Sequence, residues 1–216
     1  IRRSILLDSR ADLLVTGMGE KQLIGIARAL KSGIASNTLR LAGTAHIAKE
    51  FPQQSNFVEL PSFEAILEDS TKLLEAHIIS ERALLEGKGI VQQHADRYVV
   101  QHPAETYEPS DLDAIYDRHY SRMHLKGGFY SPALRMNLFS VTSHRGCGGG
   151  CSFCSIEVHQ GKKVISRSMD SITAEIHGLI RHPQWKGYIS DIGGATAEMY
   201  GNDCKTEACA EPSCLY

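Results

Sequence analysis

The stretch that decides the fold is Cys147-Gly148-Gly149-Gly150-Cys151-Ser152-Phe153-Cys154, which places three cysteines at the spacing C-x3-C-x2-C. Cysteine thiolates are the usual ligands of iron–sulfur clusters. Glycines have no Cβ, so they let a loop adopt positive φ and bring its backbone close to a bound group. A cube held by three cysteines keeps one iron without a protein ligand, where a second molecule can bind. The spacing therefore favours a three-cysteine iron–sulfur cluster.

Two other interpretations of the same cysteines stay open. A structural zinc site normally has four protein ligands, and His144 or His159 would supply the fourth. The thiols would otherwise be unliganded or paired in a disulfide. Disulfides persist in oxidising compartments, and no charged-then-apolar signal peptide opens this chain.

The cysteine loop, with an aromatic residue before its third cysteine, resembles the signature of radical S-adenosylmethionine (radical SAM) enzymes. Further stretches resemble the YgiQ-type radical SAM proteins, and together they cover most of the chain. They lie at 143–147, 154–156, 159–161, 166–168 and 191–201, and upstream at 2–6, 17–20 and 58–64.

The resemblance implies cofactors and roles for particular residues. Cys147, Cys151 and Cys154 would ligate a 4Fe-4S cluster, and the amino and carboxylate groups of SAM would chelate its open iron. One electron then cleaves SAM to methionine and a 5′-deoxyadenosyl radical. Phe153 would lie beside the SAM adenine. A donor such as flavodoxin or ferredoxin would supply the electron, and the substrate is not indicated.

The resemblance also implies that the glycine pair Gly193-Gly194 meets the SAM amino group. A glutamate often follows these glycines in the superfamily, whereas Ala195 follows them here. Asp191 or Glu198 are the acidic candidates for that role. Taken without the cysteines upstream, paired glycines favour a plain turn after a strand.

The fold class that we expect is α/β. An N-terminal Rossmann-like α/β module would occupy 1–120, and a connecting loop would occupy 121–137. The start of a radical SAM partial (β/α)6 TIM-type barrel would occupy 138–216. Barrel active sites lie at the carboxyl ends of the strands, which would bring the cysteine loop and the glycine pair to one rim.

Hydrophobic periodicity and end signals predict the elements of this fold. Ser62 is a candidate helix cap, and 110–113 resembles a capping box. The turn at 17–19 lacks the third glycine of a dinucleotide-binding fingerprint, which favours a plain strand–turn–helix unit. Strands are predicted at 13–15, 98–100, 138–142 and 188–192, and helices at 21–31, 62–86, from 110 onward and at 172–180.

Composition limits the function classes. The net charge of −2 gives no indication of nucleic-acid binding. No apolar run approaches the ~18–20 residues of a membrane span, so we expect a cytoplasmic enzyme without a membrane partner. The 216-residue chain begins at Ile1 and ends at Tyr216, and we expect it to be an inactive piece of a longer enzyme.

Three further cysteines, Cys204, Cys209 and Cys214, follow at the spacing C-x4-C-x4-C. They would bind an auxiliary iron–sulfur cluster or zinc, or they are ordinary thiols. The alternative functions are a non-catalytic zinc- or iron–sulfur-binding module and an electron-transfer iron–sulfur protein.

Overall fold

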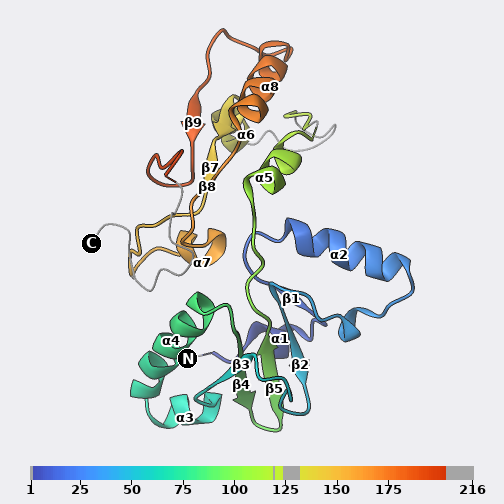
Figure 1. Cartoon of the computed structure of the whole chain (residues 1–216), viewed down its shortest axis with the longest axis vertical. Helices are drawn as coiled ribbons and strands as arrows, with labels where there is room; N and C mark the ends of the chain where they lie inside the picture. Colours follow the sequence, from blue (N-terminus) through green and yellow to red (C-terminus); the bar gives the residue numbers. More distant parts are fainter. Residues whose placement is uncertain (1, 119, 124–131, 203–216) are drawn as a thin grey trace. The chain divides into compact units, whose positions relative to one another are not determined.

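The computed structural model describes residues 2–118, 120–123 and 132–202. Cys204, Cys209 and Cys214 lie outside the described residues. The chain divides between Thr106 and Tyr107 into two compact units, unit 1 before this point and unit 2 after it. Figure 1 shows the order of helices and strands along the chain.

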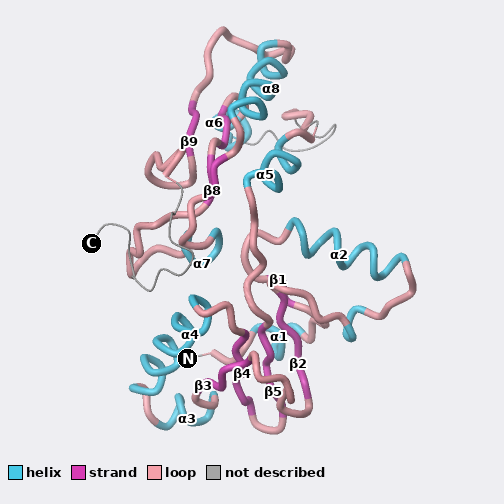
Figure 2. The backbone as a smooth tube through the Cα atoms, viewed as in Figure 1, coloured by secondary structure: helices cyan, strands magenta, loops and turns pink. Residues whose placement is uncertain are grey.

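Unit 1 is built on a five-stranded mixed sheet (Figure 2). Its neighbouring pairs are antiparallel except for one parallel pair, β3 with β4. The α/β class is therefore confirmed, but the parallel sheet that a Rossmann-like module implies is wrong for this unit. In spatial order the strands are β1 (Leu14–Val15), β2 (Thr44–Ala48), β5 (Arg97–Gln101), β4 (Gly89–His94) and β3 (Phe57–Leu60).

The turn between β4 and β5 explains why these strands cannot be parallel. Only Ala95 and Asp96 separate the two strands, and His94 pairs with Arg97. A connection of two residues can only reverse the chain, whereas parallel strands need a crossover of a dozen residues or more. Ala95 takes φ 53°, as tight hairpin turns require of a central residue.

Helices and one short 3-10 turn complete unit 1. The predicted helix at 21–31 is confirmed as α2, and Ser62 does cap a helix, because its side chain accepts a hydrogen bond from the Ala65 N–H at 3.1 Å. The single helix predicted over 62–86 is wrong. Asp69 is extended and accepts from the Thr71 N–H at 2.9 Å, which ends one helix and starts the next. The elements are α1 (Ile5–Ser9), α2 (Glu20–Lys31), η1 (Ser36–Thr38), α3 (Phe63–Glu68) and α4 (Thr71–Leu85).

Unit 2 contains a parallel strand–helix–strand arrangement. Strand β6 (Ser140–Thr142) pairs in parallel with β9 (Asp191–Gly193), and α8 (Met169–Ile180) connects them in sequence. The strands predicted at 138–142 and 188–192 are thus confirmed as strands, and no closed barrel is present in the described part of the chain. The other elements are α5 (Pro109–Tyr116), α6 (Pro132–Asn137), β7 (His144–Arg145), α7 (Ile156–Gln160) and β8 (Ile165–Ser166).

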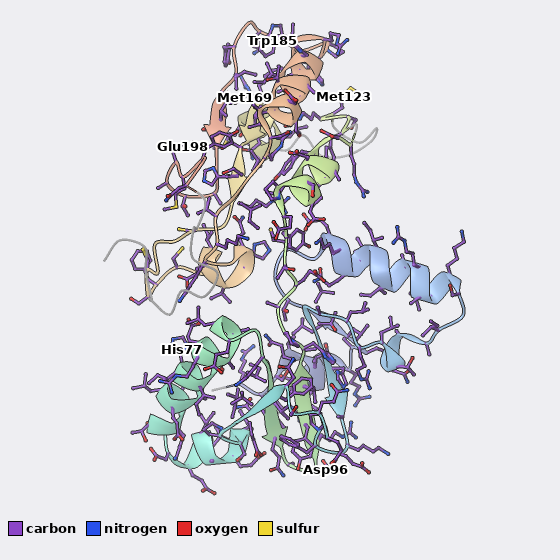
Figure 3. The ribbon with its side chains drawn as sticks, in the orientation of Figure 1. His77, Asp96, Met123, Met169, Trp185 and Glu198 are labelled. Atoms are coloured by element: carbon purple, nitrogen blue, oxygen red, sulfur yellow. The ribbon has the colours of Figure 1, made fainter. Side chains whose placement is uncertain are left out.

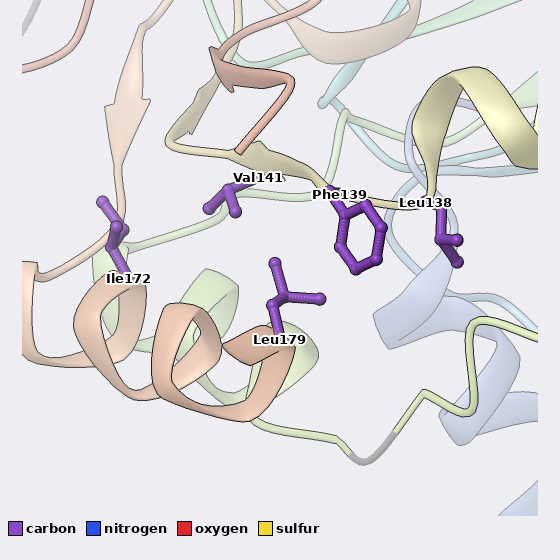
Figure 4. Close-up of a cluster of buried hydrophobic side chains, with 5 residues drawn as sticks. All are labelled: Leu138, Phe139, Val141, Ile172 and Leu179. Atoms are coloured by element: carbon purple, nitrogen blue, oxygen red, sulfur yellow. The ribbon is translucent and has the colours of Figure 1, made fainter. Parts of the chain in front are cut away.

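The apolar core of unit 2 lies between β6 and α8 (Figure 4). Leu138, Phe139 and Val141 face Ile172 and Leu179 of the helix. The side chain of Trp185, which follows α8 in Figure 3, meets the Phe139 ring edge-on with 5.2 Å between ring centroids. Burial of these side chains from water holds the helix against the strand.

Helix α5 belongs to unit 2, whereas the N-terminal module predicted at 1–120 would include it. Its capping box is formed by Glu108 and Asp111, with Pro109 in the first turn, so the helix starts slightly earlier than the predicted box at 110–113. The Asp113 carboxylate accepts from the Ser168 N–H at 2.9 Å, which ties α5 to the start of α8.

Candidate functional site

The cysteine loop follows directly after β7. Cys147 is buried, Cys154 is half-buried and Cys151 is exposed, and all three are free thiols. A disulfide among these three cysteines is therefore not formed. The Cys154 N–H donates to the Cys151 carbonyl at 2.9 Å, which closes a tight turn between the second and third cysteines.

Gly149 brings two of the sulfur atoms to one side of the loop. A Cβ placed on Gly149 would lie 3.3 Å from the Cys147 Sγ and 3.6 Å from the Cys151 Sγ. Both thiols thus lie in contact range of the space that a side chain at 149 would fill. Glycine at 149 leaves this space free of a side chain.

The base of the loop is fixed by the segment that follows α7. Gly146 has φ 92°, and a Cβ there would lie 2.1 Å from the Lys163 carbonyl oxygen. The Cys147 N–H donates to the Gly161 carbonyl at 3.0 Å, and the Gly146 N–H donates to the Gln160 side chain at 3.1 Å. Only glycine combines this φ with this close approach of two backbones.

The two histidines considered as a fourth zinc ligand differ in their surroundings. His144 is buried, and both of its ring nitrogens have hydrogen-bond partners, while His159 is exposed. Among the described residues, no three His, Cys, Asp or Glu side chains lie close enough together to hold a metal ion. Cluster ligation by Cys147, Cys151 and Cys154 therefore stays a prediction, which the free thiols and the open space at Gly149 support.

Phe153 lies in the turn between the last two cysteines and is 90% exposed. Its predicted place beside the SAM adenine is not tested by any contact of the ring. An aromatic ring with this exposure next to the thiols has apolar surface available to a planar ligand.

The glycine pair lies beside the segment that leads into the cysteine loop. Gly193 is the last residue of β9, where it pairs with Thr142 of the neighbouring parallel strand. The Ser143 N–H donates to the Gly193 carbonyl at 2.9 Å. The chain continues from Ser143 through β7 into the cysteines, so both motifs follow the carboxyl ends of adjacent parallel strands.

Glu198 is the acidic side chain nearest the glycine pair among the two candidates. A Cβ on Gly193 would lie 3.2 Å from a Glu198 carboxylate oxygen and 3.9 Å from one of Asp191. Asp191 also accepts from the Ser140 hydroxyl at 3.3 Å. Figure 3 shows Glu198 in the loop that follows β9.

Arg167 is a central residue of unit 2. It is 1% exposed and donates to the Thr142 carbonyl at 2.8 Å and the Glu175 carboxylate at 2.5 Å. Its guanidinium lies 4.4 Å from the centre of the Tyr116 ring. Glu175 also binds Arg122, which donates to the Ser140 carbonyl at 2.8 Å. Arg167 therefore holds β6, α8 and α5 together inside unit 2.

No helix within the described ranges is long and apolar enough to cross a bilayer. No solved structure matches the chain.

Comparison with known proteins gives the family. The model of the family described as Radical SAM N-terminal matches residues 1–135. Over its whole length the chain is 42% identical to a UPF0313 protein of Methanocella arvoryzae and 37% identical to one of Clostridium botulinum. A UPF0313 protein of Methanocaldococcus jannaschii is 38% identical. The chain spans 38%, 35% and 36% of these relatives, respectively.

The family model ends before the cysteine loop, but the similarity to the relatives continues through it, since all of the chain is aligned. The match therefore includes both the front of the chain and the strands that carry the two glycine-rich motifs. The resemblance inferred from the sequence is confirmed: the chain belongs to the radical SAM N-terminal family, in its YgiQ-type group.

Proposed function

We propose that this chain carries the cluster- and SAM-binding part of a radical SAM enzyme. The observation that supports this most is the placement of two glycine-rich loops after adjacent parallel strands, one with three free thiols and one beside a carboxylate. Family membership supports the same class of enzyme. The substrate is left open.

Each motif has a separate task in this proposal. Cys147, Cys151 and Cys154 hold a 4Fe-4S cluster, which when bound supplies the electron that cleaves SAM. Gly193 and Gly194 leave room for the amino-acid end of SAM because they carry no side chain. The Glu198 carboxylate, beside Gly193, is placed to accept hydrogen bonds from the cationic amino group. The exposed Phe153 ring offers a face to the adenine.

The rest of the predicted setting belongs to the same proposal. Strands β6 and β9 with α8 are the first unit of a partial (β/α)6 barrel. The protein acts in the cytoplasm, and a flavodoxin or ferredoxin delivers the electron. Cys204, Cys209 and Cys214 remain candidates for a second metal site.

Anaerobic reconstitution with iron and sulfide tests the proposal. We expect broad visible absorption and a reduced cluster EPR signal that shifts when SAM is added, and, in a longer enzyme that contains this chain, formation of 5′-deoxyadenosine. Cys147→Ala, Cys151→Ala or Cys154→Ala should each abolish all three readouts, because each removes one of three ligands. Ser152→Ala, an exposed change in the same loop, is the matched control and should leave them intact.

The alternatives give different results in the same experiment. A zinc module would bind colourless, EPR-silent metal. An electron-transfer protein would show a cluster signal that SAM does not shift. Full iron content and 5′-deoxyadenosine formation in the cysteine variants would disprove the assignment of these ligands.

A further inference from the structure

His144 has an unusual position between the two proposed cofactor-binding loops. It lies in β7, three residues before Cys147, and its side chain is fully buried. In the antiparallel pair β7–β8 it lies opposite Ser166. Its backbone therefore belongs to the cysteine loop, while its side chain contacts the other motif.

Gly194 packs directly against the imidazole ring of His144. A Cβ on Gly194 would lie 2.3 Å from Nε2, 2.6 Å from Cε1 and 2.8 Å from Cδ2. Real Cβ atoms do not approach other heavy atoms this closely. A residue with a side chain therefore cannot replace Gly194 while the His144 ring keeps this position. The second glycine of the pair is thus explained by packing on His144, and not only by the need for a turn.

The chain beyond the glycine pair returns to the same ring. The Met199 N–H donates to Nε2 of His144 at 3.3 Å. An Nε2 that accepts leaves the proton on Nδ1, which lies 2.9 Å from the Ser143 hydroxyl and 3.4 Å from a Glu198 carboxylate oxygen. That same Glu198 oxygen accepts from the Tyr200 N–H at 2.9 Å. The imidazole thus holds both ends of the loop from 194 to 199.

The backbone pairing of β6 with β9 does not by itself hold the loop from 194 to 199 in place. Its last bond, from the Ser143 N–H to the Gly193 carbonyl, ends at the first glycine. Among the described residues after Gly193, His144 contacts Gly194, Glu198 and Met199.

We propose that His144 is a positioning residue that fixes the Gly193-Gly194 turn and the Glu198 carboxylate relative to the cysteine loop. This inference rests on the proposed function. Its consequence is that His144 affects SAM binding without affecting cluster assembly, because the contacts described for its ring are with Ser143 and the loop after Gly193. A buried residue with a merely structural role would lower both together.

The first test compares His144→Phe with His159→Phe, an exposed histidine in α7 that serves as the matched control. Phenylalanine keeps a planar ring for Gly194 but removes both hydrogen bonds. We expect parental iron and sulfide contents in both variants. In His144→Phe, the SAM concentration that half-shifts the cluster EPR signal should rise at least roughly tenfold, as expected for one or two lost hydrogen bonds worth about 1.4 kcal/mol together.

The second test uses the contact between Gly194 and the ring. Gly194→Ala forces a methyl group into the imidazole, so we expect a large loss of SAM response with iron retained. The double variant Gly194→Ala/His144→Ala makes room for the methyl group and should respond to SAM better than Gly194→Ala alone. Such non-additivity is the mark of two residues in contact.

The outcomes separate this inference from the proposed function. If the parent assembles a cluster and responds to SAM, but His144→Phe responds equally well, only the positioning role is overturned. Loss of iron in His144→Phe also overturns it, because the residue would then support the cysteine loop itself. A parent without a SAM response overturns both proposals.

Discussion

Gly146 shows at the level of one residue how the cysteine loop is held. Its φ of 92° is one that side-chain-bearing residues rarely adopt, and its Cα faces the Lys163 carbonyl. The next residue, Cys147, is the one buried thiol of the described three. The position of that thiol therefore depends on a backbone contact that only glycine permits.

We expect Gly146→Ala to lower the free energy of unfolding of unit 2 by more than about 2 kcal/mol, because it adds a steric clash to an unfavourable φ. Gly161→Ala is the matched control. Gly161 has a similar φ of 88°, but nothing lies within 4 Å of its Cβ position. Its φ of 88° and ψ of 165° lie in a region that is essentially restricted to glycine, so Gly161→Ala should cost this strain alone, about 1–3 kcal/mol, and less than Gly146→Ala. Urea unfolding monitored by circular dichroism measures both, and equal losses would contradict the role of the Lys163 contact.

At the scale of elements, the anchor of α8 is ionic as well as apolar. Glu175 extends from the helix to both Arg122 and Arg167, and its side chain is only 11% exposed. Both arginines also donate to carbonyls of β6, at Ser140 and Thr142. One carboxylate thus neutralises two cations that hold the strand carrying the site.

We expect Glu175→Gln to destabilise unit 2 by about 3 kcal/mol, because removing one partner leaves buried arginine charge without compensation. Asp170→Asn, in the exposed first turn of the same helix, serves as the control and should change stability by less than about 1 kcal/mol. Equal, small effects in thermal or urea unfolding would show that the ion pairs of Glu175 with the two arginines contribute little to stability.

The elements that the sequence predicted correctly share a clear pattern. Strand β6 and helix α8 have apolar residues at the spacing of their own structure, and Gly33, just past the end of α2, takes φ 81°. Strands β2 and β4 were not predicted, because His46, Gln92, Gln93 and His94 interrupt any alternation of apolar and polar residues. Their pairing comes from neighbouring strands, which local patterns do not encode.

In the candidate site, too, residues marked by a local sequence pattern could be predicted, and residues that meet only in the folded chain could not. Spacing alone indicated the three cysteines as a candidate cluster site, and the resemblance to a known family added the glycine pair. The contact of His144 with Gly194 joins residues fifty positions apart in sequence, so no local pattern could reveal it. Arg167 was equally hidden, because an arginine in a polar segment gives no sign that it is buried.

At the scale of the whole chain, the two units differ in what their polar interiors contain. Unit 2 buries Arg167 together with His144, whereas the sheet of unit 1 buries His46 and His94. His46 is 4% exposed, and its ring stacks on that of His102 with 5.2 Å between centroids. Nδ1 of His46 and Nε2 of His102 have no hydrogen-bond partner among the described residues.

These surroundings favour neutral imidazoles in unit 1. Burial, with smaller contributions from the Arg40 and His102 charges, lowers the pKa of His46 to about 4. Burial also lowers the pKa values of His94 and His102. Above pH 6.5 the histidines are neutral in both folded and unfolded chains, so their titration does not affect stability. Below pH 6.5 the unfolded chain binds protons first, and the folded state loses stability until the folded pKa is reached.

We therefore expect the free energy of unfolding of unit 1 to fall as the pH is lowered from 6.5 to 4, with about 3 kcal/mol of the loss due to His46. His46→Phe keeps a ring to stack on His102 but cannot take up a proton. Urea titrations of the full chain at several pH values should give a shallower decline for this variant than for the parent. His77→Phe, at an exposed position in α4, is the control and should follow the parent. Parallel declines in the parent and His46→Phe would show instead that carboxylates, and not this buried histidine, set the acid sensitivity of the unit.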